Sequence, residues 1–269
     1  MGGHQEEMKK GNILLTGSSG KLGQAIIRAS KYFSHLLTPS EDTLDITKPN
    51  TIKDFFDTND IDGVIHCAAL ARMAECESNP LKAMLVNVVG TCNLVAEVMR
   101  KENKSAKKIR FIYISTDGVY PGVRGNYSEK DETIPYNKYG WTKLGGECAV
   151  NLLSNYCIIR TSFFDPQDIK FDYSATDSFS SKVDIGYLVK AIAEILEGDF
   201  IGTINIGGER KSDYERYRQF KPDLKPCKLQ DILKSISFNI ARDASMDCSL
   251  WKRIEAGKLI HSQNGKLRP

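Results

Sequence analysis

Short apolar runs alternate with helix-like segments over the first 160 residues of the chain. The runs are apolar without interruption, which is typical of strands that are buried on both faces. We expect strands at 12–15, 35–38, 63–67, 109–115 and 156–160. Apolar residues at three- and four-residue intervals predict helices at 21–30, 49–57, 80–101 and 139–153. This alternation predicts an α/β fold with a doubly wound, parallel Rossmann sheet.

The pattern changes after Arg160, where a polar segment with several aromatic residues begins. Asp184 can cap a helix that runs to Leu196, residues 202–208 resemble a strand and a turn, and Ser212 can cap a short helix. A basic tail that contains prolines follows. We therefore expect a nucleotide-binding domain at 8–160 and a small α/β substrate-binding lobe at 161–269. A crossover of the chain back to the main sheet is left open.

Composition narrows the class of protein. The 269 residues are 41% hydrophobic and 26% charged, as in ordinary globular proteins. The net charge is only +3, so we expect neither a nucleic acid nor a membrane surface as a partner. The chain has no run of 18 apolar residues, so we expect no transmembrane helix. Residues 1–10 lack the apolar core of a signal peptide; we interpret them as a loose leader or tag remnant, with Met8 as a candidate native start.

The cysteines and histidines indicate the compartment and argue against a metal site. Seven cysteines form no CxxC pair, and most lie within apolar patterns. This favours a cytoplasmic protein with reduced, buried thiols over a disulfide framework. The four histidines are scattered along the chain, so we expect no metal cluster.

The stretch TGSSGKLG, residues 16–23, directly follows the first apolar run. Gly17 would allow the tight turn, Gly20 would let the backbone approach a pyrophosphate, and Gly23 would let the helix pack closely. The free N–H groups and the positive end of the helix dipole would then hold the phosphates. The predicted loop also contains Ser19, Lys21 and Leu22, and Lys21 could add a positive charge. Ordinary turn chemistry is the alternative interpretation.

A tyrosine and a lysine lie one helical turn apart in YGWTK, at positions 139 and 143. At this spacing both side chains lie on the same face of a helix. Tyrosine is a weak acid, with an ordinary pKa of about 10, and a nearby ammonium group lowers that pKa. The pair would suit proton donation to a ketone that is being reduced. Two solvated helix residues are the alternative.

Three motifs together carry a family resemblance: TGSSGKLG, YISTDGVY at 113–120 and YGWTKLGGE at 139–147. The chain resembles the extended short-chain dehydrogenases/reductases and, among them, the dTDP-4-dehydrorhamnose reductase family. The resemblance extends from Ile13 to about Leu250. One departure is Gly118, where the family commonly has tyrosine. The lobe after Arg160 diverges most.

The resemblance implies roles for individual residues. Thr116 would bind the substrate carbonyl oxygen, Tyr139 would donate the proton, and Lys143 would hold the cofactor ribose and lower the pKa of Tyr139. Asn87 would brace the region of the catalytic lysine; a simple helix-surface asparagine is the alternative. We interpret His66 as a core residue without a catalytic role.

Further cofactor-binding positions are implied at the ends of two strands. Asp45 and Ile46 would lie beside the adenine, and the small residues Cys67, Ala68 and Ala69 would lie beneath the ribose and phosphate. Alternatively, Asp45 and Thr47 only cap the following helix, with Thr47 as N-cap and Pro49 in the first turn. An acidic residue after the second strand would bind the ribose 2′-hydroxyl of NADH and repel the 2′-phosphate of NADPH. Residues 38–40 include no acid, and we therefore expect NADPH rather than NADH.

The implied activity is reduction of the 4-keto group of a nucleotide-linked 6-deoxy sugar, in the synthesis of polysaccharide precursors. Alternatives are a non-catalytic, nucleotide-binding regulatory subunit and a nucleotide-sugar epimerase on the same fold. A dehydratase is disfavoured, because Gly118 stands where its second acid would be needed. Some relatives form a homodimer through a bound Mg²⁺, and the sequence leaves both features open.

Overall fold

A computed structural model describes residues 11–257 of the chain. Its centre is a six-stranded sheet in the order β10-β5-β4-β3-β1-β2, and every neighbouring pair is parallel. The strands are β1 (Asn12–Thr16), β2 (His35–Leu37), β3 (Ile61–His66), β4 (Arg110–Thr116), β5 (Tyr156–Thr161) and β10 (Gly202–Ile206). From β1 the chain moves to β2 on one side and then to β3 on the other. This reversal marks the position where such sheets bind ligands, at the carboxyl ends of the strands.

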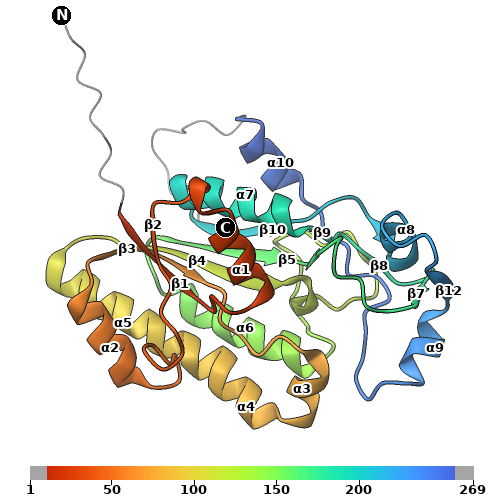
Figure 1. The fold of residues 1–269 in the computed structure, drawn as a ribbon, viewed down its shortest axis with the longest axis horizontal. Helices are drawn as coiled ribbons and strands as arrows, with labels where there is room; N and C mark the ends of the chain where they lie inside the picture. The colour runs from red at the N-terminus through yellow and green to blue at the C-terminus, as the bar shows by residue number, and fades with distance from the viewer. Residues whose placement is uncertain (1–10, 258–269) are drawn as a thin grey trace, which may run out of the picture.

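Helices cover both faces of the sheet (Figure 1). Helices α1 (Lys21–Arg28) and α7 (Ile185–Glu197) lie on one face. The other face carries α2 (Pro49–Thr58), α4 (Pro80–Met84), α5 (Gly90–Ser105) and α6 (Lys138–Val150). The predicted doubly wound α/β fold is confirmed.

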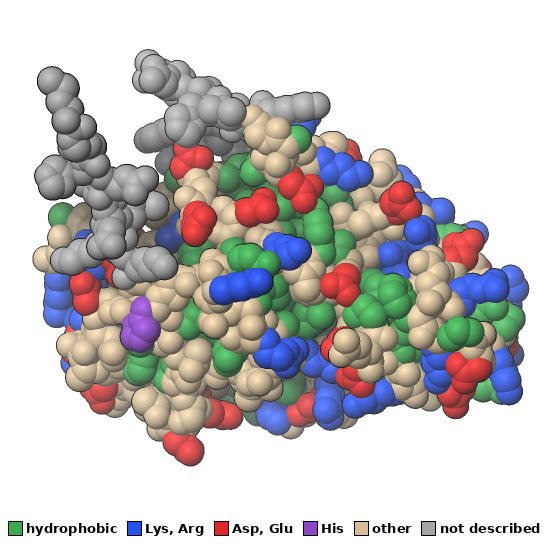
Figure 2. Space-filling model, turned by 45° about the horizontal axis from the view of Figure 1, so that its top comes forward, with side chains coloured by type: hydrophobic (Ala, Val, Ile, Leu, Met, Phe, Trp, Pro, Cys, Tyr) green, Lys and Arg blue, Asp and Glu red, His purple; other side chains and the backbone are tan. Residues whose placement is uncertain are grey.

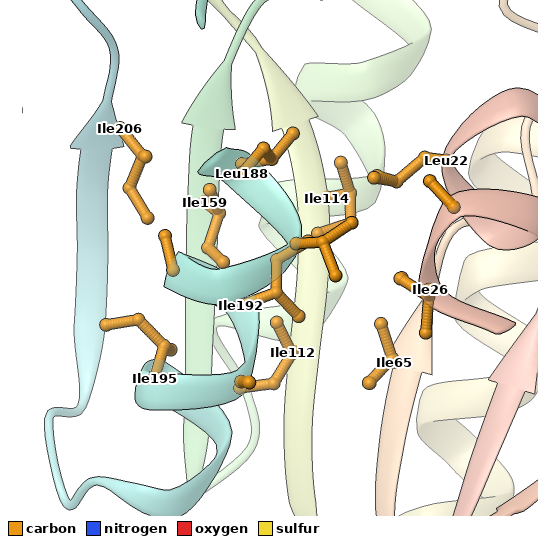
Figure 3. Close-up of a cluster of buried hydrophobic side chains, with 14 of the residues drawn as sticks. Leu22, Ile26, Ile65, Ile112, Ile114, Ile159, Leu188, Ile192, Ile195 and Ile206 are labelled. Atoms are coloured by element: carbon orange, nitrogen blue, oxygen red, sulfur yellow. The ribbon is translucent and has the colours of Figure 1, made fainter. Parts of the chain in front are cut away.

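The core on the α1/α7 side is formed almost entirely by aliphatic residues (Figure 3). Leu188 and Ile192 of α7 point onto the sheet, where they meet Ile114 and Ile159. Each of these side chains contributes about 1.5–3 kcal/mol when it is buried. A continuous apolar stripe thus holds α7 against β4 and β5.

The polar segment after β5 forms a small lobe of two-stranded pairs beyond the main sheet (Figure 1). Its pairs are β6 (Phe163–Phe164) with β9 (Val183–Asp184), β7 (Tyr173–Ala175) with β12 (Lys225–Cys227), and β8 (Phe179–Ser180) with β11 (Lys211–Ser212). Helices α8 (Asp213–Tyr217) and α9 (Leu229–Leu233) complete it. Between these pieces, α7 and β10 return to the main sheet. The chain thus makes the crossover that the sequence leaves open.

Several local elements differ from the sequence prediction. The helix expected at 80–101 is interrupted by a π-helical turn at Leu85–Val89, and α3 (Met73–Ser78) precedes it. Thr47 is not the N-cap of α2, since Lys48 takes that position and the Thr47 hydroxyl bonds Asp45 instead. Part of the expected tail forms α10 (Ser249–Glu255), which buries Trp251 in the core beneath it.

One helical segment within 11–257, Pro80–Ser105, is long and apolar enough to span a membrane by length and composition alone. Its Leu94, Val95 and Val98 are buried against the sheet. The core helix of a globular protein passes the same test, so packing in this fold accounts for the feature.

The structure also shows how charged side chains are distributed on the surface and whether the cysteines are paired. On the face in Figure 2, basic and acidic side chains are interspersed rather than gathered by sign. All seven cysteines are free thiols. The leader and the candidate start at Met8 lie outside the described residues.

Candidate active site

The glycine loop joins β1 to α1 at the carboxyl edge of the sheet. Gly17 has a φ of 69°, a left-handed conformation that favours glycine. A Cβ atom there would lie 2.5 Å from the backbone nitrogen of Ala68, so the loop rests directly on the chain that follows β3. A Cβ at Gly23 would lie 2.3 Å from the Gly17 carbonyl oxygen. Gly23 therefore lets the helix approach the loop itself rather than the sheet.

Gly20 leaves open space at the start of α1. It is the N-cap of the helix, and a Cβ atom there would meet only the Gly17 carbonyl oxygen, at 3.3 Å. The absence of a side chain at Gly20 therefore leaves the helix N-terminus accessible, as a pyrophosphate site requires. Ser19 and Lys21 flank this position and are exposed, whereas Leu22 is buried beneath the loop.

Lys21 has a partner outside the loop. Its Nζ lies 2.6 Å from Asp168 Oδ2, in the segment that leads from the main sheet into the lobe. The Lys21 side chain is 62% exposed, so this ion pair contributes little to stability.

Asp45 forms its own turn after β2. Its carboxylate accepts hydrogen bonds from the Thr47 N–H at 2.9 Å and the Thr47 hydroxyl at 2.7 Å, and it pairs with Lys48. Although partial burial acts in the opposite direction, these bonds lower the pKa of Asp45. Ile46 is buried and packs against Gly90. The proximity of Asp45 and Ile46 to an adenine stays a prediction.

His66 at the end of β3 belongs to a buried chain of hydrogen bonds. Its Nδ1 lies 2.7 Å from the Thr16 hydroxyl, and its Nε2 lies 2.9 Å from the Thr91 hydroxyl. Thr91 itself donates to the Asn87 carbonyl oxygen, so His66 donates through Nε2 and accepts through Nδ1. Burial lowers the pKa of His66 to about 3. The ring is therefore neutral and serves to fasten β1, β3 and the helix beside them.

Asn87 joins the end of β3 to the helix that carries Tyr139. Its side chain forms two hydrogen bonds with the backbone of Leu70, at 2.7 Å and 3.0 Å. Its Nδ2 also donates to the Thr142 hydroxyl, which in turn donates to the Tyr139 carbonyl oxygen. The π-helical turn at Leu85–Val89 contains this asparagine. The structure thus places Asn87 behind the backbone of the Tyr139–Lys143 turn.

Thr116 and Tyr139 meet at the carboxyl end of β4. Thr116 is buried, accepts a hydrogen bond from the Gly118 N–H at 3.0 Å, and donates to Asp117 at 3.2 Å. Tyr139 lies in the first turn of α6, close enough to Thr116 for the threonine hydroxyl to favour its phenolate form. Two hydroxyl groups from distant parts of the chain thus converge at the sheet edge that carries the glycine loop.

Lys143 lies one turn beyond Tyr139 and is buried. Its Nζ is 4.0 Å from the centre of the Tyr113 ring, a cation–π contact. Burial lowers the pKa of Lys143 to about 7, while its charge influences Cys67 at the end of β3. Lys143 thus extends from α6 toward the Cys67, Ala68 and Ala69 segment, where the resemblance implies the ribose.

The pKa of Tyr139 does not follow the expectation from the sequence. Burial and the nearby Asp117 carboxyl group raise the pKa of Tyr139 well above its ordinary value. The Lys143 ammonium group instead contacts the Tyr113 ring, and its charge acts on Cys67. In this arrangement the phenol is held fully protonated.

One residue that the sequence analysis missed supports the same helix face. Glu147 lies one turn beyond Lys143; it accepts a hydrogen bond from the Ser115 hydroxyl at 2.5 Å and pairs with Arg160 at 2.7 Å. All three side chains are buried. Glu147 continues the four-residue spacing of Tyr139 and Lys143, and this spacing could have identified it from the sequence. Glu147 thus ties α6 to the ends of β4 and β5.

A cavity of about 620 Å³ opens beside the start of α6. Tyr136, Asn137 and Trp141 line it from the main domain, and Phe238 and Asn239 line it from the chain that follows α9. It lies between the start of α6 and the chain that follows α9, and its lining includes residues on both sides of Tyr139 in the sequence. Within 11–257, no group of three or more His, Cys, Asp or Glu side chains is placed to hold a metal ion.

Curated proteins with similar sequences include several reductases. A probable low-salt glycan biosynthesis reductase from Haloferax volcanii is 36% identical over 162 residues, covering 55% of this chain and 52% of that protein. A dTDP-4-dehydrorhamnose reductase from Mycolicibacterium smegmatis is 30% identical over 205 residues, which cover 69% of this chain and 60% of that protein. Methionine adenosyltransferase 2 subunit beta from Xenopus tropicalis is 34% identical over 145 residues, which cover 51% of this chain and 42% of that protein. The matches thus span about half of the length of these curated relatives.

Solved structures share the fold over most of the chain. A dTDP-4-dehydrorhamnose reductase from Clostridium acetobutylicum superimposes with a TM-score of 0.81, at 23% identity, covering 93% of this chain and 94% of that one. A complex of the Bacillus anthracis enzyme with NADP gives a TM-score of 0.79, at 20% identity, covering 90% and 92%. The whole architecture, lobe included, is therefore that of these structures.

The family model of the RmlD substrate binding domain matches residues 11–169, which include the glycine loop, Thr116, Tyr139 and Lys143. This region makes up more than half of the chain, and the match confirms the resemblance read from its motifs. The chain therefore belongs to the RmlD substrate-binding domain family.

Proposed function

We propose that this protein is a cytoplasmic, NADPH-dependent reductase of the 4-keto group of a nucleotide-linked 6-deoxy sugar, as in dTDP-4-dehydrorhamnose reduction. The observation that carries the proposal is the convergence of the Thr116 and Tyr139 hydroxyls at the edge of the sheet, with Lys143 one turn away. A role in the synthesis of polysaccharide precursors follows from this substrate class.

The residues present fit a bound dinucleotide. The open N-terminus of α1 at Gly20 would receive the pyrophosphate, and the small residues after β3 would receive the ribose beside Lys143. Bound NADPH supplies the hydride in this chemistry. The Thr116 hydroxyl orients the carbonyl oxygen, and Tyr139 gives that oxygen its proton as the negative charge develops.

The raised pKa of Tyr139 suits this direction of reaction. A phenol that stays protonated at neutral pH is ready to donate, and the alkoxide that forms is a much stronger base than a phenolate. Lys143 then stabilises the phenolate that remains, because a negative charge beside it favours its ammonium form. The protein's own groups thus hold and move the proton.

The cofactor preference is supported by the end of β2. This strand ends at Leu37, and Thr38, Pro39 and Ser40 follow without a carboxylate. A carboxylate at this place would favour NADH, since it binds a ribose 2′-hydroxyl and repels a 2′-phosphate. The NADP complex of the Bacillus anthracis structure is consistent with the same choice.

A homodimer is supported by the apolar side chains that α4 and α6 expose. Leu81 is 61% exposed, Met84 45% and Trp141 54%, and the two helices are neighbours. Sedimentation of the purified protein should give about twice the chain mass of 30.1 kDa. A monomer at micromolar concentration would argue against this assembly.

The direct experiment is a screen of nucleotide-linked 4-keto sugars, followed by the loss of NADPH absorbance. We expect turnover with at least one dTDP-4-keto-6-deoxy sugar, and a lower kcat/KM with NADH than with NADPH. A protein that binds NADPH but reduces none of these sugars would contradict the proposal.

A second candidate function is a regulatory subunit that binds a nucleotide without turnover. The similarity to methionine adenosyltransferase 2 subunit beta supports it, because that protein is named as a subunit of another enzyme. Affinity capture of a partner, combined with no turnover of any keto sugar, would favour this candidate. The complete set of Thr116, Tyr139 and Lys143 favours the reductase.

A further inference from the structure

The C-terminal lobe brings a lysine to the edge of the proposed catalytic site. Lys182 lies between β8 and β9, and its Nζ is 2.8 Å from Asp213 Oδ1 at the start of α8. Both side chains are 21% exposed. The ammonium group also lies 5.4 Å from the centre of the Tyr217 ring. The pair is thus mostly buried but reachable from solvent.

The backbone around Lys182 is held rigidly. The buried Arg216 guanidinium donates to the carbonyl oxygens of Ser180 at 2.6 Å, Lys182 at 2.7 Å and Glu209 at 3.1 Å. These bonds fix the turn between β8 and β9 against α8. A long side chain on a fixed backbone needs little further ordering when it binds a ligand.

The turn that carries Lys182 adjoins the strand end at Thr116. Thr116 of β4 pairs with Thr161 of β5, and the Val183 N–H donates to the carbonyl oxygen of Ser162 at 3.0 Å. The charge of Lys182 acts on Asp117, whose carboxyl group accepts a hydrogen bond from Thr116. It also acts on the Tyr136 hydroxyl. Gly118 lies beside the Thr116 and Tyr136 hydroxyls, because a Cβ atom there would lie 3.3 Å from the first and 3.7 Å from the second.

Lys182 is a cation at neutral pH. Burial alone would lower its pKa, but Asp213, Tyr217 and Asp117 outweigh this and hold the pKa of Lys182 above its ordinary value. Its charge is balanced by Asp213, and the Asp117 carboxylate adds negative charge when it ionises. A diphosphate would meet these carboxylates, so the site does not favour an anion.

We propose that Lys182 and Asp213 bind the substrate hydroxyl on the carbon next to the keto carbon. The inference rests on the proposed sugar reductase function. A hydroxyl group both donates and accepts hydrogen bonds, so it can accept from an ammonium group and donate to a carboxylate at once. Thr116 would hold the carbonyl oxygen, and Lys182 lies on the turn next to Ser162, which directly follows the residue paired with Thr116. The lobe thereby selects sugars that carry this hydroxyl.

The test compares two substrates that differ in a single group. One is a dTDP-4-keto-6-deoxy sugar with a hydroxyl at C3, and the other is its 3-deoxy counterpart. We expect the wild-type kcat/KM to favour the hydroxylated sugar by about 100-fold, the scale of a hydrogen bond to a charged group. Lys182→Met should reduce this preference to about threefold or less, mainly through the hydroxylated sugar. NADPH affinity should not change.

Lys190→Met serves as the matched control, because Lys190 is an exposed lysine on α7. It should retain the full preference. If Lys182→Met does not fold, Asp213→Asn and Lys182→Arg take its place, and each should lower the preference at least tenfold. Unchanged preference in a folded Lys182 or Asp213 variant would overturn the inference, as would a wild-type protein that does not distinguish the two sugars. Absence of wild-type turnover with every keto sugar would instead reject the proposed function on which it rests.

Discussion

Arg160 Nη2 lies 2.7 Å from Glu147 Oε2, and both side chains are buried. Arg160 also donates to the Tyr120 hydroxyl, which in turn bonds Asn205 of β10. The pair therefore links α6, which carries Tyr139 and Lys143, to three neighbouring strands. We propose that this buried ion pair positions the helix that carries Tyr139 and Lys143 and takes no part in the reaction itself.

Removing one member of this pair should cost considerable stability. Glu147→Gln leaves the Arg160 charge buried without its carboxylate, and we expect a loss of about 3 kcal/mol in the free energy of unfolding. Urea denaturation followed by circular dichroism measures the change. Glu209→Gln breaks an exposed pair with Lys211 and should unfold at the wild-type midpoint. A Glu147→Gln midpoint equal to that of the control would show that the buried pair contributes nothing.

Tyr139→Phe removes the proposed proton donor while it keeps the ring. We expect kcat to fall by about 10²- to 10⁴-fold, the usual contribution of general acid catalysis. NADPH affinity, measured by fluorescence titration, should stay within about twofold of wild type. Tyr173→Phe, on an exposed strand of the lobe, is the control and should be fully active. Near-normal turnover by Tyr139→Phe would assign the proton to another group.

Two glycines of the loop should respond differently to alanine. At Gly23 the new Cβ would collide with backbone atoms, 2.3 Å from the Gly17 carbonyl oxygen, so the thermal midpoint should fall. At Gly20 the new Cβ would meet only one atom at 3.3 Å, so the fold should persist. The methyl group would instead occupy the space expected for the pyrophosphate. Gly20→Ala should therefore weaken NADPH binding at least tenfold, and an unchanged titration would remove the phosphate role from this loop.

Lys143 should make stability depend on pH in a defined window. Its pKa is lowered from 10.5 to about 7 in the folded protein, so the unfolded chain binds more protons between these values. Stability must then rise with pH in this window and level off below pH 7. Between pH 7 and about pH 8.5 the rise should be about 2 kcal/mol in the cofactor-free protein.

Lys143→Met should abolish that rise, and it should be more stable than the wild type at pH 7 although inactive. A catalytic group that weakens the fold is expected where function needs a buried charge. Lys190→Met should keep the wild-type pH dependence. Parallel stability curves for Lys143→Met and the wild type would mean that Lys143 is not destabilised by burial.

Local features of the site could be predicted from the sequence, and features made by distant contacts could not. The TGSSGKLG loop and the Tyr139–Lys143 pair are set by spacing along one strand–helix junction and one helix. The role of Thr47 was predicted wrongly, because its hydroxyl has a competing partner in Asp45 only two residues away. Burial decides the pKa of Tyr139, and burial depends on the whole fold.

The structure of the lobe depends even more on contacts between residues that are distant in the sequence. The turn that carries Lys182 is held by Arg216, which lies 34 residues further along the chain and donates to the Lys182 carbonyl oxygen. No periodicity in the sequence marks that contact. Likewise, the burial of Trp251 in α10 depends on the sheet surface beneath it, so the C-terminal segment resembles a tail when it is considered alone.

The most direct measurement follows the transferred hydrogen. The protein is incubated with a dTDP-4-keto-6-deoxy sugar and NADPH that carries deuterium in both positions at C4 of the nicotinamide, and the product is analysed by mass spectrometry and NMR. We predict a product with one deuterium, located at C4 of the sugar, formed at least about 100-fold more slowly by Tyr139→Phe. Deuterium at another carbon, or none in any keto sugar despite NADPH binding, would contradict the account.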